Sequence, residues 1–342
     1  MSGDDLRHHG DAEATPGLAD FAVNVRAPAP PPWLRDVLAE SLRGLGRYPD
    51  PTEATGAVAA RHGRRPDEVL PTAGAAEAFV LLARACRARR PVCVHPSFTE
   101  PEAALRAAGH DVHRVVLPAP YDLRPELVPD DADLVVIGNP TNPTGVLHDA
   151  RTLLALTRPG RVVVVDEAFI DTVPGERESL AAHRDAVGLV VVRSLTKTWS
   201  LAGLRVGYVL AAPPVITALA AVQPLWPVST PALAALVACA SPGAVAQADA
   251  AAMRLAVDRD YLVRGLTARG VRVVASSRAS FVLAEVPDGL GVHARLRAAG
   301  VAVRRGDTFP GLNRDHLRIA VRPPEMTDVL LAALDHTLRG SV

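Results

Sequence analysis

The sequence predicts an α/β protein: a large domain with a mostly parallel central sheet flanked by helices, then a smaller α+β domain at the C-terminal end. Apolar runs near 134–137, 161–166 and 189–192 indicate buried strands, because parallel strands are covered on both faces. Segments with helical periodicity separate these runs. Beyond about residue 270, short strands and helices alternate, which indicates a second unit.

Composition narrows the class of protein. The 342 residues are 49% apolar and 22% charged, as is ordinary for a globular enzyme. The 37 basic and 37 acidic side chains cancel, which argues against nucleic acid or an anionic membrane as a partner. We find no signal peptide and no apolar run of spanning length, so we expect a cytoplasmic protein. The three cysteines form no C-x-x-C motif, which predicts free thiols and no metal site.

The large domain is expected over 21–245, after a polar N-terminal arm at 1–20. Its first part, 21–47, contains a strand at 21–26 and a helix at 32–45, and we expect this part to pack with the small domain. Further strands are expected near 92–95, 113–117, 134–137, 161–166, 189–192 and 206–210, with helices near 79–86, 100–108, 149–157, 214–222 and 229–240.

The small domain is expected over 246–342, joined to the large one by a long helix from about 242 to 269. Its strands are placed near 271–275, 280–286, 301–304 and 316–321, and its helices near 291–299 and 324–339. Strand alternation over 316–321 predicts that Arg318 and Arg322 share a face. Solvated charge and anion recognition are both open there.

The stretch from Ser194 to Gly207 combines a lysine with groups that bind phosphate. Lys197 follows a buried strand, where low-dielectric walls favour the neutral amine that attacks a carbonyl. Arg205, Ser194 and Thr196 supply one cation and two hydroxyls for a phosphate. An ordinary basic loop is the alternative. The combination fits pyridoxal phosphate, which needs an imine-forming lysine and a phosphate site.

Three upstream features agree with this interpretation. Gly74, Ala75 and Ala76 begin a helix, whose open N–H groups favour an anion, although a tight turn needs the same residues. Two Asn-Pro units, the second at Asn142, force a loop at a strand's carboxyl end, where open parallel sheets bind ligands. Asp166 ends an apolar strand, so its buried carboxylate needs a partner such as a protonated pyridine nitrogen, unless it is only a helix cap.

Together, in this order, these motifs resemble the fold-type I pyridoxal-phosphate enzymes of the class I/II aminotransferase superfamily, over about residues 20–339. The resemblance implies that Lys197 bonds the cofactor and moves the Cα proton, and that Asp166 pairs with the pyridine nitrogen. It also implies that Asn142 contacts the 3-oxygen and that Phe98 stacks on the ring. The phosphate is then bound by the amides of Ala75 and Ala76 with Ser194, Thr196 and Arg205.

Further roles follow from the same resemblance. Tyr48 is expected to reach the cofactor phosphate of a neighbouring subunit, which implies a homodimer with shared active sites. Arg318 matches the arginine that binds the substrate carboxylate, a task that suits its bidentate fork. Many relatives have Tyr where this chain has Phe169, so a hydroxyl to the 3-oxygen is missing.

The residues around the substrate favour one branch of the superfamily. The arm Arg7-His8-His9-Gly10 resembles that of threonine-phosphate decarboxylases, in which His8 would help to bind the substrate phosphate. Arg322 also resembles that branch, and Asn24 and Arg26 are further candidate substrate contacts. We therefore expect an enzyme of cobalamin biosynthesis that decarboxylates L-threonine O-3-phosphate.

Two alternatives stay open. The first is a histidinol-phosphate or related amino-acid aminotransferase, since no motif determines which bond at Cα breaks. The second, from another class, is a non-catalytic pyridoxal-phosphate binder such as the sensor half of a transcription regulator. Only about twenty polar residues precede the expected fold, with no basic DNA-binding domain, and this counts against the second alternative.

Overall fold

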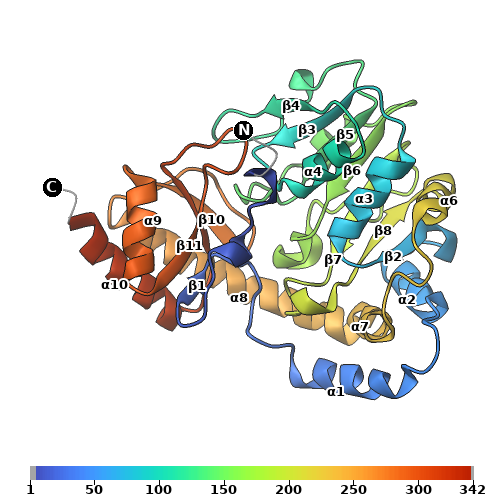
Figure 1. The fold of residues 1–342 in the computed structure, drawn as a ribbon, viewed down its shortest axis with the longest axis horizontal. Helices are drawn as coiled ribbons and strands as arrows, with labels where there is room; N and C mark the ends of the chain where they lie inside the picture. The colour runs from blue at the N-terminus through green and yellow to red at the C-terminus, as the bar shows by residue number, and fades with distance from the viewer. Residues whose placement is uncertain (1–4, 340–342) are drawn as a thin grey trace.

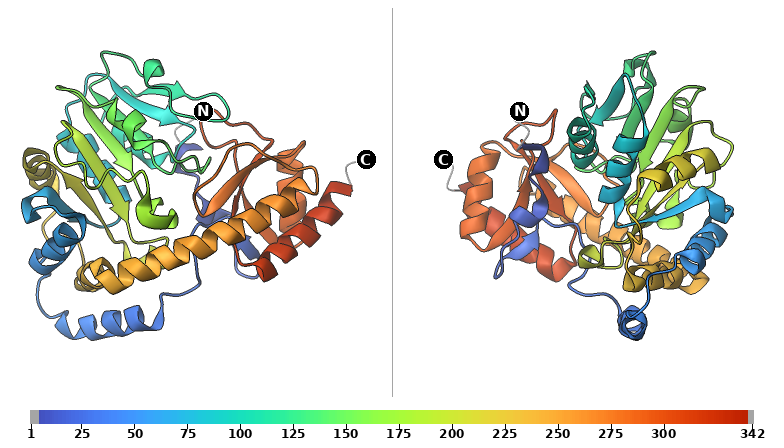
Figure 2. Two further views of the ribbon diagram at one scale, coloured as in Figure 1. Left: turned by 180° about the vertical axis from the view of Figure 1, so that it is seen from behind. Right: turned by 45° about the vertical axis from the view of Figure 1, so that its right-hand side comes forward.

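Residues 5–339 of the computed structural model form two units, each built on its own β-sheet (Figure 1). The expected arm at 1–20 and small domain at 246–342 extend by residues 1–4 and 340–342 beyond the part of the chain that the structure describes. The long helix α8 (Pro242–Thr267) runs from one unit to the other, as the view from behind in Figure 2 shows.

The larger unit contains a seven-stranded sheet in the order β2-β8-β7-β6-β5-β3-β4. Neighbours from β7 to β4 are parallel, whereas β8 is antiparallel to both β7 and β2. The strands are β2 (Val69–Thr72), β3 (Pro91–His95), β4 (His113–Val116), β5 (Leu134–Gly138), β6 (Val162–Asp166), β7 (Leu189–Ser194) and β8 (Gly207–Ala211). The mostly parallel central sheet predicted from the apolar runs is confirmed.

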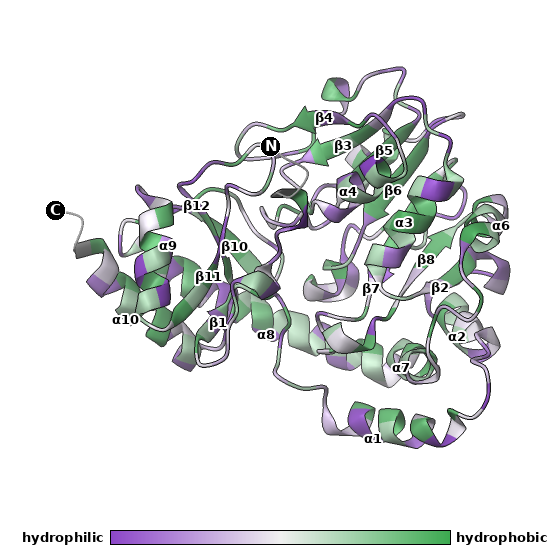
Figure 3. Cartoon of the chain, viewed as in Figure 1, coloured by the Kyte–Doolittle hydropathy of each residue, from purple (hydrophilic) through white to green (hydrophobic). Residues whose placement is uncertain are grey.

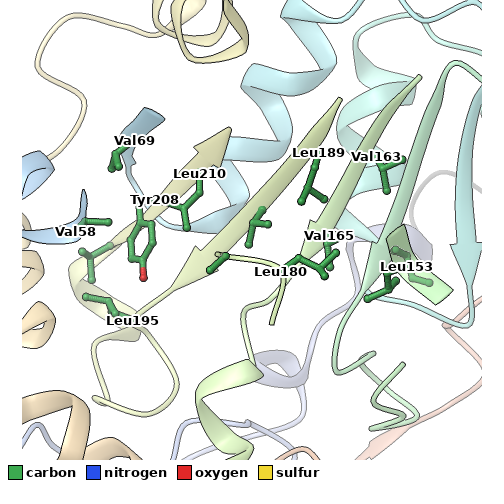
Figure 4. Close-up of a cluster of buried hydrophobic side chains, with 14 of the residues drawn as sticks. Val58, Val69, Leu153, Val163, Val165, Leu180, Leu189, Leu195, Tyr208 and Leu210 are labelled. Atoms are coloured by element: carbon green, nitrogen blue, oxygen red, sulfur yellow. The ribbon is translucent and has the colours of Figure 1, made fainter. Parts of the chain in front are cut away.

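Alternation along these strands separates two hydrophobic cores. Val163 and Val165 of β6 point into one core, while Val164 between them points into the other. Figure 4 shows the first core, where strand residues such as Leu189 and Leu210 lie in one layer. Both faces of the sheet are therefore buried, which explains why its strands are continuous apolar runs.

Helices cover both faces of this sheet. One face packs against α1 (Pro32–Ser41), α2 (Thr52–His62), α5 (Ala150–Leu154), α7 (Thr230–Ala240) and the first part of α8. The other packs against α3 (Ala75–Ala85), α4 (Glu100–Ala107) and α6 (Pro213–Val222). Sequence periodicity did not predict α2 or β2, because α2 buries only small residues and one valine on its core face.

The segment after the arm differs from the sequence expectation. Strand β1 (Ala19–Phe21) is shorter than the expected 21–26, because the Asp20 carboxylate accepts the N–H groups of Ala22 and Val23 at 2.8 and 2.9 Å and forms a turn. This strand joins the small sheet, but α1 packs on α7 of the large unit, with Leu34 in the larger core. Residues 21–47 therefore divide between the units.

The smaller unit has a five-stranded sheet in the order β1-β11-β12-β10-β9. Only β1 and β11 are parallel. Its other elements are β9 (Arg272–Val273), β10 (Phe281–Glu285), α9 (Gly289–Ala298), β11 (Val301–Arg305), β12 (His316–Ala320) and α10 (Pro324–Arg339). Ala248 of α8 belongs to the larger core and Leu255 to the smaller one, so this helix links the two cores.

Apolar residues gather on the strands and inner helix faces, as the hydropathy colouring in Figure 3 shows. Within residues 5–339, no single helix is long and apolar enough to cross a membrane. Helices α7 and α8 pass that test only as a pair bent by 77°, on length and composition alone.

Candidate active site

The polar residues predicted from the sequence follow the carboxyl ends of neighbouring strands. β3 leads to Phe98, β5 to Asn142, β6 ends at Asp166 and β7 leads to Lys197. Because these four strands are parallel, their carboxyl ends meet at one edge of the sheet. Topology thus collects side chains that are far apart in the sequence.

A cavity of about 430 Å³ lies at this edge and extends toward the small sheet and the N-terminal arm. Of the residues predicted for the site, those lining the cavity are Asn24, Ala75, Ala76, Phe98, Asn142, Asp166, Ser194, Thr196, Lys197, Arg205 and Arg318.

Lys197 is held in a setting that favours its neutral form. Burial, together with the charges of Arg318 and Arg205, lowers the pKa of its amine from 10.5 to about 8, although the charge of Asp166 raises it. Between residues 5 and 339 the amine has no ion-pair partner. A nucleophilic amine needs this loss of its proton.

The Asp166 carboxylate lacks a cationic partner within residues 5–339. Burial raises its pKa from 3.8 to about 6, and its hydrogen bond from the Ala168 N–H (3.0 Å) and the charge of Lys197 offset this only in part. No arginine or histidine of the described chain forms an ion pair with it. A protonated ring nitrogen in the cavity fits this carboxylate.

A phosphate-sized anion fits the start of α3. Gly74 has φ +78°, and a Cβ there would lie 2.8 Å from Nη2 of Arg205, so glycine lets the guanidinium approach the helix N-terminus. Ser194 Oγ and Thr196 Oγ1 lie 2.8 Å apart, and the bond between them uses one hydroxyl proton and leaves the other to donate. Open helix N–H groups, a cation and a hydroxyl together form an anion site.

Asn142 is oriented by Arg318, whose Nη1 donates to Oδ1 of Asn142 at 2.7 Å. Since arginine only donates, the amide N–H₂ of Asn142 is left for the cavity, where it can donate to a ring oxygen. Phe169 lines the same cavity with its ring centroid 6.0 Å from Nζ of Lys197. It supplies no hydroxyl, so Asn142 is the donor available for that oxygen.

Three predicted substrate contacts lie elsewhere. His8 bonds Glu13 through Nε2 at 2.9 Å, and the next residue, His9, lines the cavity instead because side chains alternate along extended backbone. The Arg26 guanidinium donates to the Ala251 carbonyl on α8 at 2.7 Å. The structure does not place either His8 or Arg26 where it would bind substrate.

Arg322 is the third predicted substrate contact that lies outside the cavity. Its guanidinium donates to the carbonyls of Asp20, Val23 and Val25 at 2.8, 2.7 and 2.9 Å, and it does not line the cavity. Strand β12 ends at Ala320, so the alternation that would place Arg322 beside Arg318 stops before it. Arg322 holds the residue 20–25 segment against the small sheet.

Sequence reasoning missed Arg304. It lines the cavity from β11 with 1% of its surface exposed, and its Cα pairs with that of Arg318 across β11 and β12. Direct partners in an antiparallel pair lie on the same face, so the two guanidiniums are neighbours. Burial lowers the pKa of both guanidiniums. The charge of Arg304 lowers the pKa of Arg318 further. Only the register of the two strands could have identified this pair.

Tyr48 lies away from the cavity. It is 74% exposed and stacks on Trp226 with the ring centroids 4.1 Å apart. Within this chain Tyr48 does not line the cavity that contains Lys197 and the anion site at the start of α3.

A sheet edge that carries Lys197, Asp166 and the anion site at the start of α3 defines a fold-type I pyridoxal-phosphate enzyme. Asp166 fits the ring nitrogen of that cofactor, and the anion site fits its phosphate. Residues 20–334 match the model of the aminotransferase class I and II family. The chain therefore belongs to this family, and the resemblance seen in the sequence is confirmed.

Several relatives share nearly the whole chain. A histidinol-phosphate aminotransferase of Mycobacterium tuberculosis is 53% identical over 96% of this chain and 90% of its own length. A threonine-phosphate decarboxylase of Salmonella typhimurium is 29% identical over 94% of this chain and 92% of its own. The crystal structure of a histidinol-phosphate aminotransferase from Sinorhizobium meliloti with pyridoxal-5'-phosphate is 21% identical, with a TM-score of 0.85 over 94% of this chain and 91% of its own.

Proposed function

We propose that this enzyme transfers the amino group of histidinol phosphate to a keto acid. The observation that carries the proposal is the pair of buried guanidiniums of Arg304 and Arg318, of which Arg318 has no carboxylate partner within residues 5–339 and Arg304 has only the longer contact to Glu13. Glu13 lies 3.7 Å from Arg304 and is also bonded to His8 and His293. Two cations facing one cavity suit a phosphate dianion.

The relative at 53% identity supports transamination over the decarboxylation that the sequence analysis favoured, because the decarboxylase relative is only 29% identical. Bound pyridoxal phosphate withdraws electrons from the bonds at the substrate Cα. Lys197, whose amine pKa is lowered to about 8, then moves the proton at Cα, while the arginine pair fixes the other end of the substrate.

Decarboxylation of L-threonine O-3-phosphate remains the second candidate. The arm that the sequence analysis associated with that branch does cross the cavity, and Gly10 lies against Arg318: a Cβ on Gly10 would be 3.1 Å from its Nη2.

One experiment separates the two candidates. Purified enzyme is incubated with O-phospho-L-threonine without a keto acid, and separately with histidinol phosphate and 2-oxoglutarate. We expect glutamate from the second mixture and no carbon dioxide from the first. Carbon dioxide and aminopropanol phosphate without an acceptor would reverse the assignment.

Replacing Arg304 with glutamine should raise KM for histidinol phosphate by ~10-fold or more, since a charge-assisted contact to phosphate is lost. The matched control is Arg305→Gln, the next residue on β11, which alternates to the opposite side and pairs with Asp307. We expect that control to stay within about twofold of wild type. Steady-state kinetics of both variants checks this, and equal KM values would remove Arg304 from the phosphate site.

We also propose a homodimer in which Tyr48 reaches the partner's cofactor phosphate. Its exposed ring lies beside exposed Leu225 and Trp226, at 79% and 51%, so an apolar surface surrounds it. Tyr48→Phe should weaken cofactor retention by roughly 10-fold through loss of one hydrogen bond to a charged group, while the dimer persists. Dialysis against buffer without cofactor measures retention and sedimentation measures the dimer. An active wild-type monomer would contradict the shared site.

A further inference from the structure

The cavity has a second polar wall that neither the cofactor nor a phosphate explains. His9, Asp11 and Glu100 line it, and two of the three are acids. A phosphate dianion beside two carboxylates is repelled, whereas the arginine pair of β11 and β12 attracts it. The substrate cavity is therefore bipolar, with cations on one wall and hydrogen-bond acceptors on another.

His9 and Glu100 form a bonded pair on this wall. Nε2 of His9 lies 2.6 Å from Oε1 of Glu100, and the His9 ring centroid lies 5.3 Å from that of Phe98. With Nε2–H donating to the carboxylate, Nδ1 of His9 is an acceptor. The second carboxylate oxygen of Glu100 has no hydrogen-bond partner in the described chain, and the same is true of the Asp11 carboxylate. Within the described chain these three acceptors have no protein donor, and because Asp11 is exposed and the His9 and Glu100 side chains are 31% and 26% exposed, they are open to a ligand or to water.

The arm that positions these acceptors is fixed on both sides of the cavity. Thr99 Oγ1 donates to the Leu6 carbonyl, and Arg304 Nη2 donates to the His8 carbonyl at 2.6 Å. Asp11 is close enough to the reaction centre to raise the pKa of Lys197. A group that meets this wall would therefore belong to the same molecule that reacts at Lys197.

We propose that His9, Asp11 and Glu100 form the subsite for an N–H-bearing ring on the substrate side chain, an imidazole or imidazolium, and that the same wall rejects a substrate carrying a carboxylate beside its phosphate. The inference rests on the proposed function and adds the residues that select among phosphorylated amines. An imidazole N–H can donate to the open carboxylate oxygens, and a carboxylate in its place adds like-charge repulsion.

The test measures binding to holoenzyme reduced with borohydride, which keeps the cofactor on Lys197 and prevents turnover. Calorimetry compares three probes: histidinol phosphate, O-phospho-L-threonine and phosphoethanolamine, which has neither ring nor carboxylate. The variants are Glu100→Gln and Asp11→Asn. The matched control is Glu53→Gln, because Glu53 lies in the first turn of α2 as Glu100 does in α4, but is exposed and outside the cavity.

We expect Glu100→Gln to weaken histidinol phosphate ~10-fold or more, since a hydrogen bond to a charged group is lost. Phosphoethanolamine should stay within about twofold and phosphothreonine should bind severalfold more tightly, because like-charge repulsion is removed. Asp11→Asn should shift the probes in the same directions, and Glu53→Gln should shift none of them.

An equal change for all three probes would overturn the subsite and leave Glu100 as a mere anchor of the arm. If wild type binds no histidinol phosphate, the proposed function is wrong, and the subsite is judged on the other two probes. A rise in the affinity of phosphothreonine relative to phosphoethanolamine in Glu100→Gln then supports the rejecting wall, and an unchanged ratio overturns it.

Discussion

Replacing Lys197 with alanine should reduce turnover by roughly 10³-fold or more, because it removes the group that we propose bonds the cofactor and moves the Cα proton. The visible absorption of the covalently attached cofactor should disappear as well. Cofactor should still bind, though more weakly, because Asp166 and the anion site at α3 remain.

Lys197 is the only lysine in the sequence, so no other lysine can bond the cofactor. Borohydride reduction of wild type followed by peptide mass analysis should place the cofactor on the peptide that contains Lys197 and on no other internal residue. Lys197→Arg is the matched control: it keeps the positive charge but offers no amine to react. Retained absorption in either variant would show that another group bonds the cofactor.

Asp166→Asn should have opposite effects on the stability of the protein with and without cofactor. The pKa of Asp166 is raised from 3.8 to about 6, so without cofactor the folded state disfavours the carboxylate. That penalty is absent below about pH 4, where the acid is protonated in both states, and is complete above pH 6. At pH 8 the variant without cofactor should be more stable than wild type by about 1–3 kcal/mol.

With cofactor bound the order should reverse, because the ring nitrogen loses the counter-ion that we propose Asp166 provides, and turnover should fall by ~10²-fold or more. Urea unfolding with and without cofactor, at pH 4 and pH 8, measures the four stabilities. Asp133→Asn is the control: the backbone N–H groups of Arg89 and Arg90 lower the pKa of Asp133, so this variant should lose stability at pH 8 in both forms. Normal turnover of Asp166→Asn would reduce that carboxylate to a cap on Ala168.

Much of the large unit was predictable because its strands are buried on both faces. Continuous apolar runs such as 162–165 and 189–192 are short and rich in the β-branched residue valine, which favours a buried strand over a buried helix. Helix α2 was not predictable, since its buried residues are Ala54, Val58 and Ala59, which give a weak apolar face. The division of residues 21–47 between the two units depends on partners about two hundred residues away or more, which local patterns do not reveal.

The sequence by itself determined which residues we propose for the cofactor end of the site. Lys197, Asp166 and Asn142 each follow a recognisable strand, and parallel strands bring their carboxyl ends together whatever the loops do. Only the tertiary structure decided which residues we propose for the substrate end. Arg304 faces the cavity because of the β11–β12 register, and Arg322 does not because β12 stops at Ala320. His9 replaces His8 because one residue of extended arm reverses the direction of a side chain, a choice made by contacts between distant segments and not by the local sequence.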